Sequence, residues 1–260
     1  MAYAYEISEI TKEEALSMVR RYHYSNTLPK LNKHYIGFYL SKKLVGVVTL
    51  GWGTRPLHTI QKIFPSLKTK DYFEIGRMCM TEEMPRNSES QMLSQLVEWI
   101  KQNCPEVKVL FTWADGMVGK PGYVYQASNF WYLGYIWTDI YMKDGVKIHV
   151  RQTKKLFRKD ENDKRKTVRP TLEQMRKYGI NHYKGKQFKY LFFVCDKKTA
   201  RALSEECEET LTREYPKEKD LEWKVKDDNG KWTFCNKPPY KTDMDVSTMV
   251  EHLGVEEQNC

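Results

Sequence analysis

Residues Pro85–Ser90, which read PRNSES, lie between two apolar runs and decide the fold of the chain around them. The run before them, Tyr72–Met80, is rich in aromatic and apolar residues, and the segment after them, Glu89–Gln102, carries apolar residues at helical spacing. Val107–Trp113 is then a short apolar run of the kind that forms a buried strand. Strand, polar turn, helix and strand make a βαβ crossover, so we expect the two strands to be parallel neighbours.

The polar turn could hold an anion. Ser88 is a favourable N-cap residue, and Gln91 three positions later would complete a capping box. The backbone N–H groups of the first helical turn, with Arg86 beside them, would then attract a negatively charged group. The alternative is that Ser88 only caps the helix and Arg86 is solvated, since capping patterns are common. Sheets of this kind bind ligands beyond the carboxyl ends of parallel strands, which here means the turn together with Asp115-Gly116.

The composition excludes several classes of protein. The chain has 260 residues, of which 40% are hydrophobic, enough for a substantial core. No run approaches the ~18 consecutive apolar residues of a membrane span, and the start of the chain does not have the pattern of a signal peptide. The six cysteines are scattered without C-x-x-C spacing, which argues against a disulfide framework or a zinc knot. We therefore expect a cytoplasmic protein with reduced thiols and no membrane partner.

The net charge of +9 is concentrated in one segment. Residues 151–190 contain fourteen Lys and Arg against four Asp and Glu, so this segment carries the whole positive excess. Such a segment is typical of proteins that bind polyanions, nucleic acid first of all, although a solvated linker has the same composition. Aromatic residues that interleave the charges could stack on bases; they are Phe157, Tyr178, Tyr183, Phe188 and Tyr190.

The pattern of predicted elements changes near residue 150. Residues 1–150 predict a mixed α/β core that begins with a strand, a capped helix over Lys12–Tyr22 and a hairpin over 35–50. Gly51-Trp52-Gly53 at the end of this hairpin indicates a bend or a close approach of backbone. Residues 151–260 predict a basic extension that packs on the core and contacts nucleic acid, with a strand at about 190–194 and a helix at about 198–215.

A few side chains could carry chemistry. Asp115 ends the second buried strand, where a carboxylate could act as a general base or hold a metal, or only cap the next turn. His23 follows a helix, where it could bind a metal or carry a proton, or only bond to backbone carbonyls. Tyr125 and Ser128 share one face of a short predicted helix, and Tyr125 could be a general acid or only pack. No strongly spaced metal, nucleotide or phosphate-loop motif is present.

Glu74 and Arg77 lie on the strand that enters the polar turn. In a regular strand their side chains would point to opposite faces of the sheet, because successive side chains alternate. A β-bulge would bring the two charges to the same face, but the sequence by itself does not identify one.

Taken together, these motifs resemble the Mom family of phage DNA-modification proteins, of which phage Mu encodes a member. The resemblance rests on Glu74–Met80 followed by PRNSES, then on Ala114-Asp115-Gly116 and Tyr125–Phe130, with His23-Tyr24-Ser25 upstream. It covers roughly residues 20–140. It implies a GNAT-like acyltransferase fold, which is an α/β fold with a mixed, mostly antiparallel sheet, one central parallel βαβ crossover and flanking helices.

The resemblance also implies an activity. Members of the family convert adenine in DNA to N6-carbamoylmethyl-adenine, which protects phage DNA from restriction enzymes in the bacterial host. The substrate would be double-stranded DNA with a flipped adenine, on which Trp52, Trp113 or Trp131 could stack. Two other functions stay open. One is a conventional N-acetyltransferase that uses acetyl-CoA on a protein or small amine, and the other is a non-catalytic nucleic-acid-binding protein.

Candidate site residues follow from the positions that match the family's motifs, and their roles are inferred. The catalytic candidates are Asp115, His23, Tyr125, Tyr24 and Ser128, with Asp115 and His23 expected to meet in one pocket. The cofactor-binding candidates are Arg77, Arg86, Asn87, Ser88, Glu89 and Ser90.

The cofactor is not settled by these residues. His23, Asp115 and Tyr125 offer the oxygen and nitrogen ligands that suit iron. The turn at 86–90 lacks the glycine with which typical GNAT enzymes approach the coenzyme A pyrophosphate. The donor is therefore acetyl-CoA or another acyl or glycyl donor.

Overall fold

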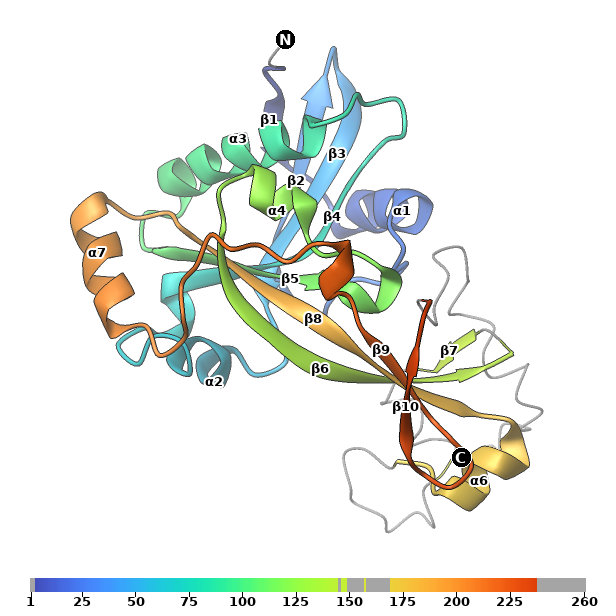
Figure 1. The fold of residues 1–260 in the computed structure, drawn as a ribbon. Helices are drawn as coiled ribbons and strands as arrows, with labels where there is room; N and C mark the ends of the chain where they lie inside the picture. Colours follow the sequence, from blue (N-terminus) through green and yellow to red (C-terminus); the bar gives the residue numbers. More distant parts are fainter. Residues whose placement is uncertain (1–2, 145, 149–156, 158–168, 238–260) are drawn as a thin grey trace. The chain divides into compact units, whose positions relative to one another are not determined.

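The computed structural model describes residues 3–144, 146–148, 157 and 169–237 (Figure 1). Two compact units alternate along the chain. The first consists of Met1–Ala114, Gly122–Tyr135 and Phe188–Pro216, and the second of the remaining segments. Residues 188–216, which the sequence assigns to the extension, belong with the first unit. The strands β6 (Trp131–Lys143) and β8 (Asn181–Phe193) contribute residues to both units.

The first unit contains a mixed sheet with flanking helices. Its elements, besides parts of β6 and β8, are β1 (Glu6–Glu9), α1 (Lys12–Tyr22), β2 (Leu31–Leu40), β3 (Lys43–Trp52), α2 (Pro56–Gln61), η1 (Thr69–Asp71), β4 (Tyr72–Met80), α3 (Ser88–Asn103), most of β5 (Val109–Asp115), α4 (Tyr123–Ala127) and α7 (Lys197–Glu206).

The strand order of this sheet is β1-β2-β3-β4-β5, continued by β8 and β6. The pairs from β1 to β4 are antiparallel, whereas β4 and β5 are parallel. The helix α3 forms the crossover between the parallel strands, as the sequence predicts (Figure 1). The protein is thus an α/β protein with a GNAT-like arrangement, a mostly antiparallel sheet that has one parallel βαβ crossover.

The core of the first unit confirms two predicted helices. The five apolar residues of α3 that share one face are all buried, and each contributes roughly 1.5–3 kcal/mol; they are Met92, Leu93, Leu96, Val97 and Ile100. The helix α1 has the predicted bounds and the predicted capping box. Thr11 Oγ1 accepts the Glu14 N–H at 3.2 Å, and Glu14 Oε2 accepts the Thr11 N–H at 2.8 Å. The α1 residues Ala15 and Val19 are buried against the sheet.

The second unit is a smaller assembly with its own apolar clusters. It contains α6 (Leu172–Tyr178), β7 (Val146–Ile148), β9 (Trp223–Lys226) and β10 (Trp232–Cys235), with residues 136–143 of β6 and 181–187 of β8. The strand β9 pairs with β8 and with β10, and β7 pairs with β6, all antiparallel. One cluster of buried side chains, which consists of Met117, Ile140, Met142 and Trp223, fills one side of this sheet.

Two predicted bounds in the C-terminal half are wrong. The predicted strand at 190–194 is only the end of β8, which begins at Asn181, because the lysines and the glycine of 181–189 obscure its alternation. The predicted helix at 198–215 ends at Glu206. The chain after it forms contacts with other segments: Glu208 N–H donates to Ile63 O at 3.0 Å, and Thr212 pairs with Tyr132.

The five cysteines that the structure describes are free. Within the described ranges, no helix is both long enough and apolar enough to cross a membrane.

Candidate functional site

A β-bulge interrupts the pairing of β3 with β4 in the first unit. The register shifts next to the pair formed by Thr49 and Arg77, which leaves Gly76 without a partner on β3. Glycine suits this position because a Cβ there would lie 2.7 Å from Pro29 Cγ. An extra residue resets the alternation of side chains, so Glu74 and Arg77 come to the same face and their charges interact.

Arg77 ties the bulge to the segment that follows α1. Its Nε donates to Thr27 O at 2.8 Å, and its Nη2 donates to Ser25 Oγ at 2.9 Å. The Ser25 N–H lies 2.9 Å from His23 Nδ1, and the Ser25 carbonyl oxygen lies 3.1 Å from the same nitrogen, so Ser25 fixes the position of the ring. The ring also stacks on Tyr24, with centroids 4.3 Å apart. The structure therefore brings together Arg77 and the His23-Tyr24-Ser25 motif, which are more than fifty residues apart in the sequence.

Glu74 is the titratable group of this region whose pKa is most informative. Burial raises the pKa of its carboxyl group to about 7, against the charge of Arg77 and a hydrogen bond from the Gly53 backbone, which both act to lower it. A carboxyl group with such a pKa is about half ionised at neutral pH, so it can take up or release a proton. Gly53 approaches so closely that a Cβ there would lie 2.6 Å from Glu74 Oε2.

Asn32 supplies a hydrogen-bond acceptor beside the bulge. It pairs with Gly51 of β3, which in turn pairs with Glu74 of β4. Its Nδ2 donates to Pro29 O at 3.0 Å, whereas its Oδ1 is buried without a donor among the residues that the structure describes. A buried acceptor without a donor costs roughly 1–3 kcal/mol. Asn32 Oδ1 is therefore suited to accept an N–H group from a bound molecule.

The sequence analysis did not select Glu74 or Asn32 as site residues. The available signal for Glu74 is an acidic residue in an apolar strand that also contains Gly76, since a glycine within a strand often marks a bulge. The close approach expected at Gly51 is confirmed, because a Cβ there would lie 2.0 Å from Leu31 O. No signal identifies Asn32, since the isolation of its oxygen depends on the register of β2 and β3.

The polar turn before α3 does not form the predicted capping box. The N-cap is Asn87, which has a left-handed φ of 72° and makes no side-chain capping bond. Ser88 is buried, and its hydroxyl donates to Pro85 O at 2.7 Å. Gln91 Oε1 accepts the N–H of Tyr3 at 2.8 Å instead of closing the box. The N-cap prediction is wrong because Asn87 tolerates the left-handed conformation, Ser88 bonds to the local carbonyl of Pro85, and Gln91 is engaged by Tyr3 far away in the sequence.

The start of α3 keeps some features of an anion site. Arg86, Asn87 and Glu89 are exposed, and the Ser90 hydroxyl donates to Asn87 O at 2.8 Å. The N–H groups of the first turn have no acceptor within the helix and favour negative charge, but the carboxylate of Glu89 competes for the same helix end. Cofactor binding by this turn stays a prediction.

Asp115 and His23 lie in different units. Asp115 Oδ1 accepts the Met117 N–H at 3.0 Å and so caps the short helix η2 (Gly116–Val118) of the second unit. This is the turn-capping role that the sequence offered as an alternative. The expected meeting of Asp115 with His23 stays a prediction. No cluster of three or more His, Cys, Asp or Glu side chains in the described part of the chain could hold a metal ion, so iron has no support.

Tyr125 lies in the core of the first unit. Its hydroxyl accepts a hydrogen bond from Thr112 Oγ1 at 3.1 Å, and its ring contacts Phe130 and Tyr190. Burial raises the pKa of Tyr125, so the phenol keeps its proton. The Ser128 hydroxyl donates to a backbone carbonyl of α4 at 2.8 Å. These contacts agree with the packing alternative, and a catalytic role for either residue stays a prediction.

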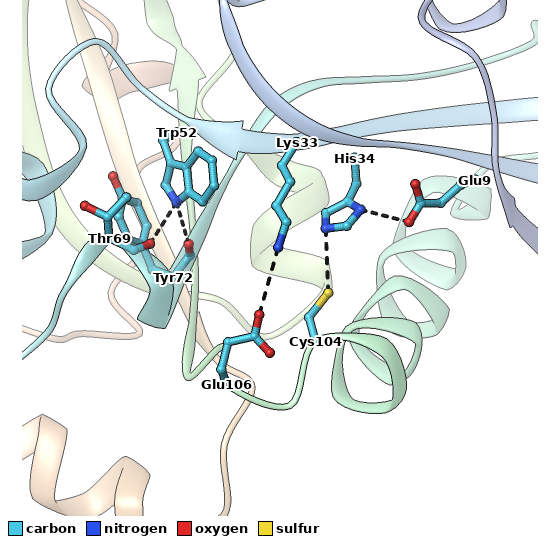
Figure 2. A network of polar contacts seen from close by, with 8 residues as sticks. All are labelled: Glu9, Lys33, His34, Trp52, Thr69, Tyr72, Cys104 and Glu106. Carbon is cyan, nitrogen blue, oxygen red and sulfur yellow. Dashed lines mark hydrogen bonds and ion pairs between the residues drawn. The ribbon is translucent and has the colours of Figure 1, made fainter.

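The three tryptophans considered for base stacking pack against one apolar cluster of the first unit. Trp52 Nε1 donates to Thr69 O at 2.8 Å and to Tyr72 O at 3.0 Å, as Figure 2 shows. Trp131 is covered by a guanidinium group, with Arg213 Cζ 4.0 Å from its ring centroid. Both rings thus have structural partners in the first unit.

Cys104, His34 and Glu9 are arranged in the order of a catalytic triad (Figure 2). His34 Nε2 lies 3.8 Å from Cys104 Sγ, and His34 Nδ1 lies 2.9 Å from Glu9 Oε1. Cys104 is only 2% exposed, and burial together with the charge of Glu106 raises the pKa of its thiol. A nucleophilic cysteine needs access and a lowered pKa, so these three side chains have a packing role.

Two solved structures show a distant likeness to the chain. An N-acetyltransferase from Staphylococcus aureus is 12% identical, with a TM-score of 0.39 over 75% of this chain and 100% of its own. An acetyltransferase of the GNAT family from Streptococcus pneumoniae is 13% identical, with a TM-score of 0.36 over 52% of this chain and 89% of its own. Both TM-scores are too low to carry an argument.

Similarity of sequence is more informative. Over 135 residues, the chain is 31% identical to the protein named methylcarbamoylase mom of Escherichia phage Mu. This match covers 52% of the chain and 56% of the relative, so the chain spans about half the length of the curated relative that it matches. The profile of the Mom protein family matches residues 4–217, which is most of the chain. The chain therefore belongs to the Mom protein family.

Proposed function

We propose that the protein is a transferase that modifies adenine in DNA at N6, with a carbamoylmethyl (acetamido) group or a closely related adduct as the product. Membership of the Mom family and the likeness to a methylcarbamoylase support this proposal. The substrate is double-stranded DNA from which the target adenine is flipped, because N6 cannot be reached within the stack. In the cytoplasm of a bacterial host, the modification would protect phage DNA from restriction enzymes.

The observation that carries the proposal is the partly buried carboxyl group of Glu74 at the β4 bulge, whose pKa is raised to about 7. The N6 amine of adenine is conjugated with the ring and is a weak nucleophile, so its attack needs a base. A pKa of about 7 suits Glu74 for this task near neutral pH. The N6–C bond forms, the bond between that carbon and the donor's leaving group breaks, and one N6 proton passes to Glu74. For the carbamoylmethyl product the leaving group must be on the methylene carbon of the donor, whereas transfer of an acyl group from a thioester gives an N6-amide, the related adduct. Asn32 Oδ1 accepts the second N6–H and orients the amine.

The donor is an acyl or glycyl group on a carrier such as coenzyme A. Its anionic part binds at the start of α3, where Arg86 is exposed and the first-turn N–H groups favour negative charge. The leaving group departs as its anion, and the His23 ring, fixed by Ser25, relays the proton that this anion later takes up. Arg77 holds His23 in this position through Ser25.

Nucleoside mass spectrometry tests the proposal. Plasmid DNA from bacteria that express the protein is digested, and its adenine nucleosides are weighed. We expect the adduct with the wild-type protein and about 10²–10⁴-fold less with Glu74→Gln, whereas Glu82→Gln, which changes an exposed carboxylate, leaves the yield unchanged. Wild-type yield from Glu74→Gln would refute its role as the base.

The same experiment separates the alternatives. Unmodified adenine in every condition, together with acetyl transfer from acetyl-CoA to a protein or small amine, would identify a conventional N-acetyltransferase. Unmodified adenine together with DNA binding that weakens steeply with salt would identify a non-catalytic nucleic-acid-binding protein.

A further inference from the structure

The sheet of the second unit has two chemically different faces. The face that carries Trp223 packs on Met117, Ile140 and Met142. Side chains alternate along a strand, so Lys224 and Lys226 of β9 point to the opposite face. Direct pairing places Lys184 of β8 beside Lys224, and Lys224 beside Phe234 of β10. We call this opposite face the lysine–aromatic face; its members are Trp137, Lys184, Lys224, Lys226, Trp232 and Phe234.

Cations and rings alternate closely on the lysine–aromatic face. The Nζ of Lys224 lies 4.4 Å from the ring centroid of Trp137 and 4.7 Å from that of Phe234. The Nζ atoms of Lys184 and Lys226 lie 4.5 Å and 5.3 Å from the ring centroid of Trp232. A cation–π contact orients an ammonium group but leaves its positive charge in place.

Acidic side chains beside this face are paired, and one of them, Asp139, is paired with Lys184 of the face itself. Asp139 accepts a hydrogen bond from His182 at 3.0 Å and forms ion pairs with Arg169 at 3.2 Å and Lys184 at 3.9 Å. Burial would raise the pKa of Asp139, but the hydrogen bond from His182 and these positive charges hold it below its ordinary value.

Glu222 is paired with Lys186 at 3.3 Å, and in the turn between β9 and β10 Asp227 Oδ1 accepts the backbone N–H groups of Asn229 and Lys231. Among the residues that the structure describes, neither Lys224 nor Lys226 forms an ion pair. Their charges are therefore not neutralised within the described chain, which favours an anionic partner. Phe234 is 70% exposed, so a large flat ring stands in solvent beside these cations.

We propose that the lysine–aromatic face binds a DNA strand that has unpaired bases, with Phe234 stacked on a base and Lys224 and Lys226 on the neighbouring phosphates. The charge requires a polyanion, and the exposed ring requires a planar partner that is not already stacked. This inference rests on the proposed function, since flipping an adenine leaves the opposite base without its partner. It assigns DNA contacts to β9 and β10, outside the basic segment 151–190.

Fluorescence anisotropy with the full chain tests the inference. The probes are a labelled single strand, the matching perfect duplex and a duplex with a central mismatched bubble. We expect Phe234→Ala to weaken binding of the single strand and the bubble about tenfold and of the perfect duplex much less, and Phe234→Tyr to restore it. For Lys224→Gln/Lys226→Gln on the single strand, the slope of log K against log salt should shrink by about 1.4, as for two lost phosphate contacts.

Matched controls alter surfaces outside this face. Leu57→Ala removes an exposed apolar side chain, and Lys197→Gln/Lys198→Gln removes two exposed cations of α7. Unchanged affinity and salt slope in the Phe234 and Lys224/Lys226 variants, or equal losses in the controls, would overturn the inference. Nucleoside mass spectrometry of the wild-type reaction reports separately on the proposed function. If the wild type modifies adenine but the variants of the face bind DNA normally, only the proposed role of the lysine–aromatic face is refuted. If the variants lose binding but the wild type yields no modified adenine, only the proposed transferase activity is refuted.

Discussion

Glu74 links the stability of the first unit to pH. The pKa of its carboxyl group rises from 4.5 to about 7 on folding, so the folded state binds the proton more tightly. This tighter proton binding stabilises the folded state fully below about pH 4.5. The stabilisation, about 3 kcal/mol, is lost as the pH rises through 7. Glu74→Gln is neutral at every pH and removes this dependence.

Urea unfolding of both proteins at pH 5 and pH 8 measures the effect. We expect the free energy of unfolding of the wild type, relative to Glu74→Gln, to fall by up to about 3 kcal/mol between these pH values. Other titrating groups cancel in the comparison because both proteins share them. Parallel pH dependences of the two proteins would show that the carboxyl group is not buried as described.

Cys104 tests whether the triad-like arrangement is structural. Its thiol is 2% exposed and burial raises its pKa, so we expect iodoacetamide to leave it unlabelled in the folded protein and to label it after unfolding. Cys104→Ser should keep the yield of modified adenine, with a loss of stability of about 1 kcal/mol. Peptide mass spectrometry locates the label. Rapid labelling of Cys104 in the folded protein, accompanied by loss of activity, would instead indicate that Cys104 is a nucleophile in the reaction.

At the scale of the strand, the two glycines that flank Trp52 have different tasks. A Cβ at Gly53 would meet the flexible end of Glu74, 2.6 Å from Oε2, whereas a Cβ at Gly51 would meet backbone, 2.0 Å from Leu31 O. We expect Gly53→Ala to displace the carboxylate and lower the yield of modified adenine at least tenfold, with stability changed by less than about 1 kcal/mol. Gly51→Ala should cost about 1–3 kcal/mol or more, because backbone has to move.

Thermal unfolding and nucleoside analysis of the two glycine variants separate these effects. The two variants would not differ in this way if Gly53 served only to maintain the backbone conformation. In that case both variants would lose stability together and would keep wild-type activity per folded molecule.

Sequence patterns correctly predicted the elements that are determined by interactions between residues close together in the sequence. The bounds of α1 follow from its capping box, and the βαβ crossover follows from apolar periodicity interrupted by one polar turn. The bulge at Gly76 and the isolated Oδ1 of Asn32 depend on register between strands, which a single sequence does not encode locally. The predicted capping box at Ser88 is wrong in part for a related reason, since Gln91 accepts the N–H of the distant Tyr3, although the Ser88 bond to Pro85 is local.

At the scale of the whole molecule, the composition showed where positive charge is concentrated, but it did not show which cations lack an acidic partner. Much of the basic segment 151–190 lies outside the described residues, including most of the charge run at 154–169. Of its described lysines, Lys186 is paired with Glu222 and Lys189 with Glu209. Among the described residues, Lys177 within the segment and Lys224 and Lys226 beyond it form no ion pair. Binding of DNA phosphates by residues 151–190 stays a prediction.

The two units therefore have separable tasks if both proposals hold, and kinetics can separate them. Lys224→Gln/Lys226→Gln removes cations that would contact DNA equally before and during the reaction, so we expect a higher KM for DNA with kcat unchanged. Glu74→Gln removes a base that acts only in the transition state, so we expect a lower kcat with KM unchanged. Because the two losses are independent, the combined variant should lose kcat/KM by the product of the separate factors.

The rate of formation of modified adenine, measured over a range of DNA concentrations, gives all three constants. Lys197→Gln/Lys198→Gln serves as the charge-matched control and should behave as the wild type. A fall in kcat for the Lys224/Lys226 variant at saturating DNA would mean that these lysines act in the chemical step. A combined variant no worse than Glu74→Gln alone would mean that DNA reaches the carboxyl group without using the lysine–aromatic face, because a contact that carries no binding energy cannot change kcat/KM.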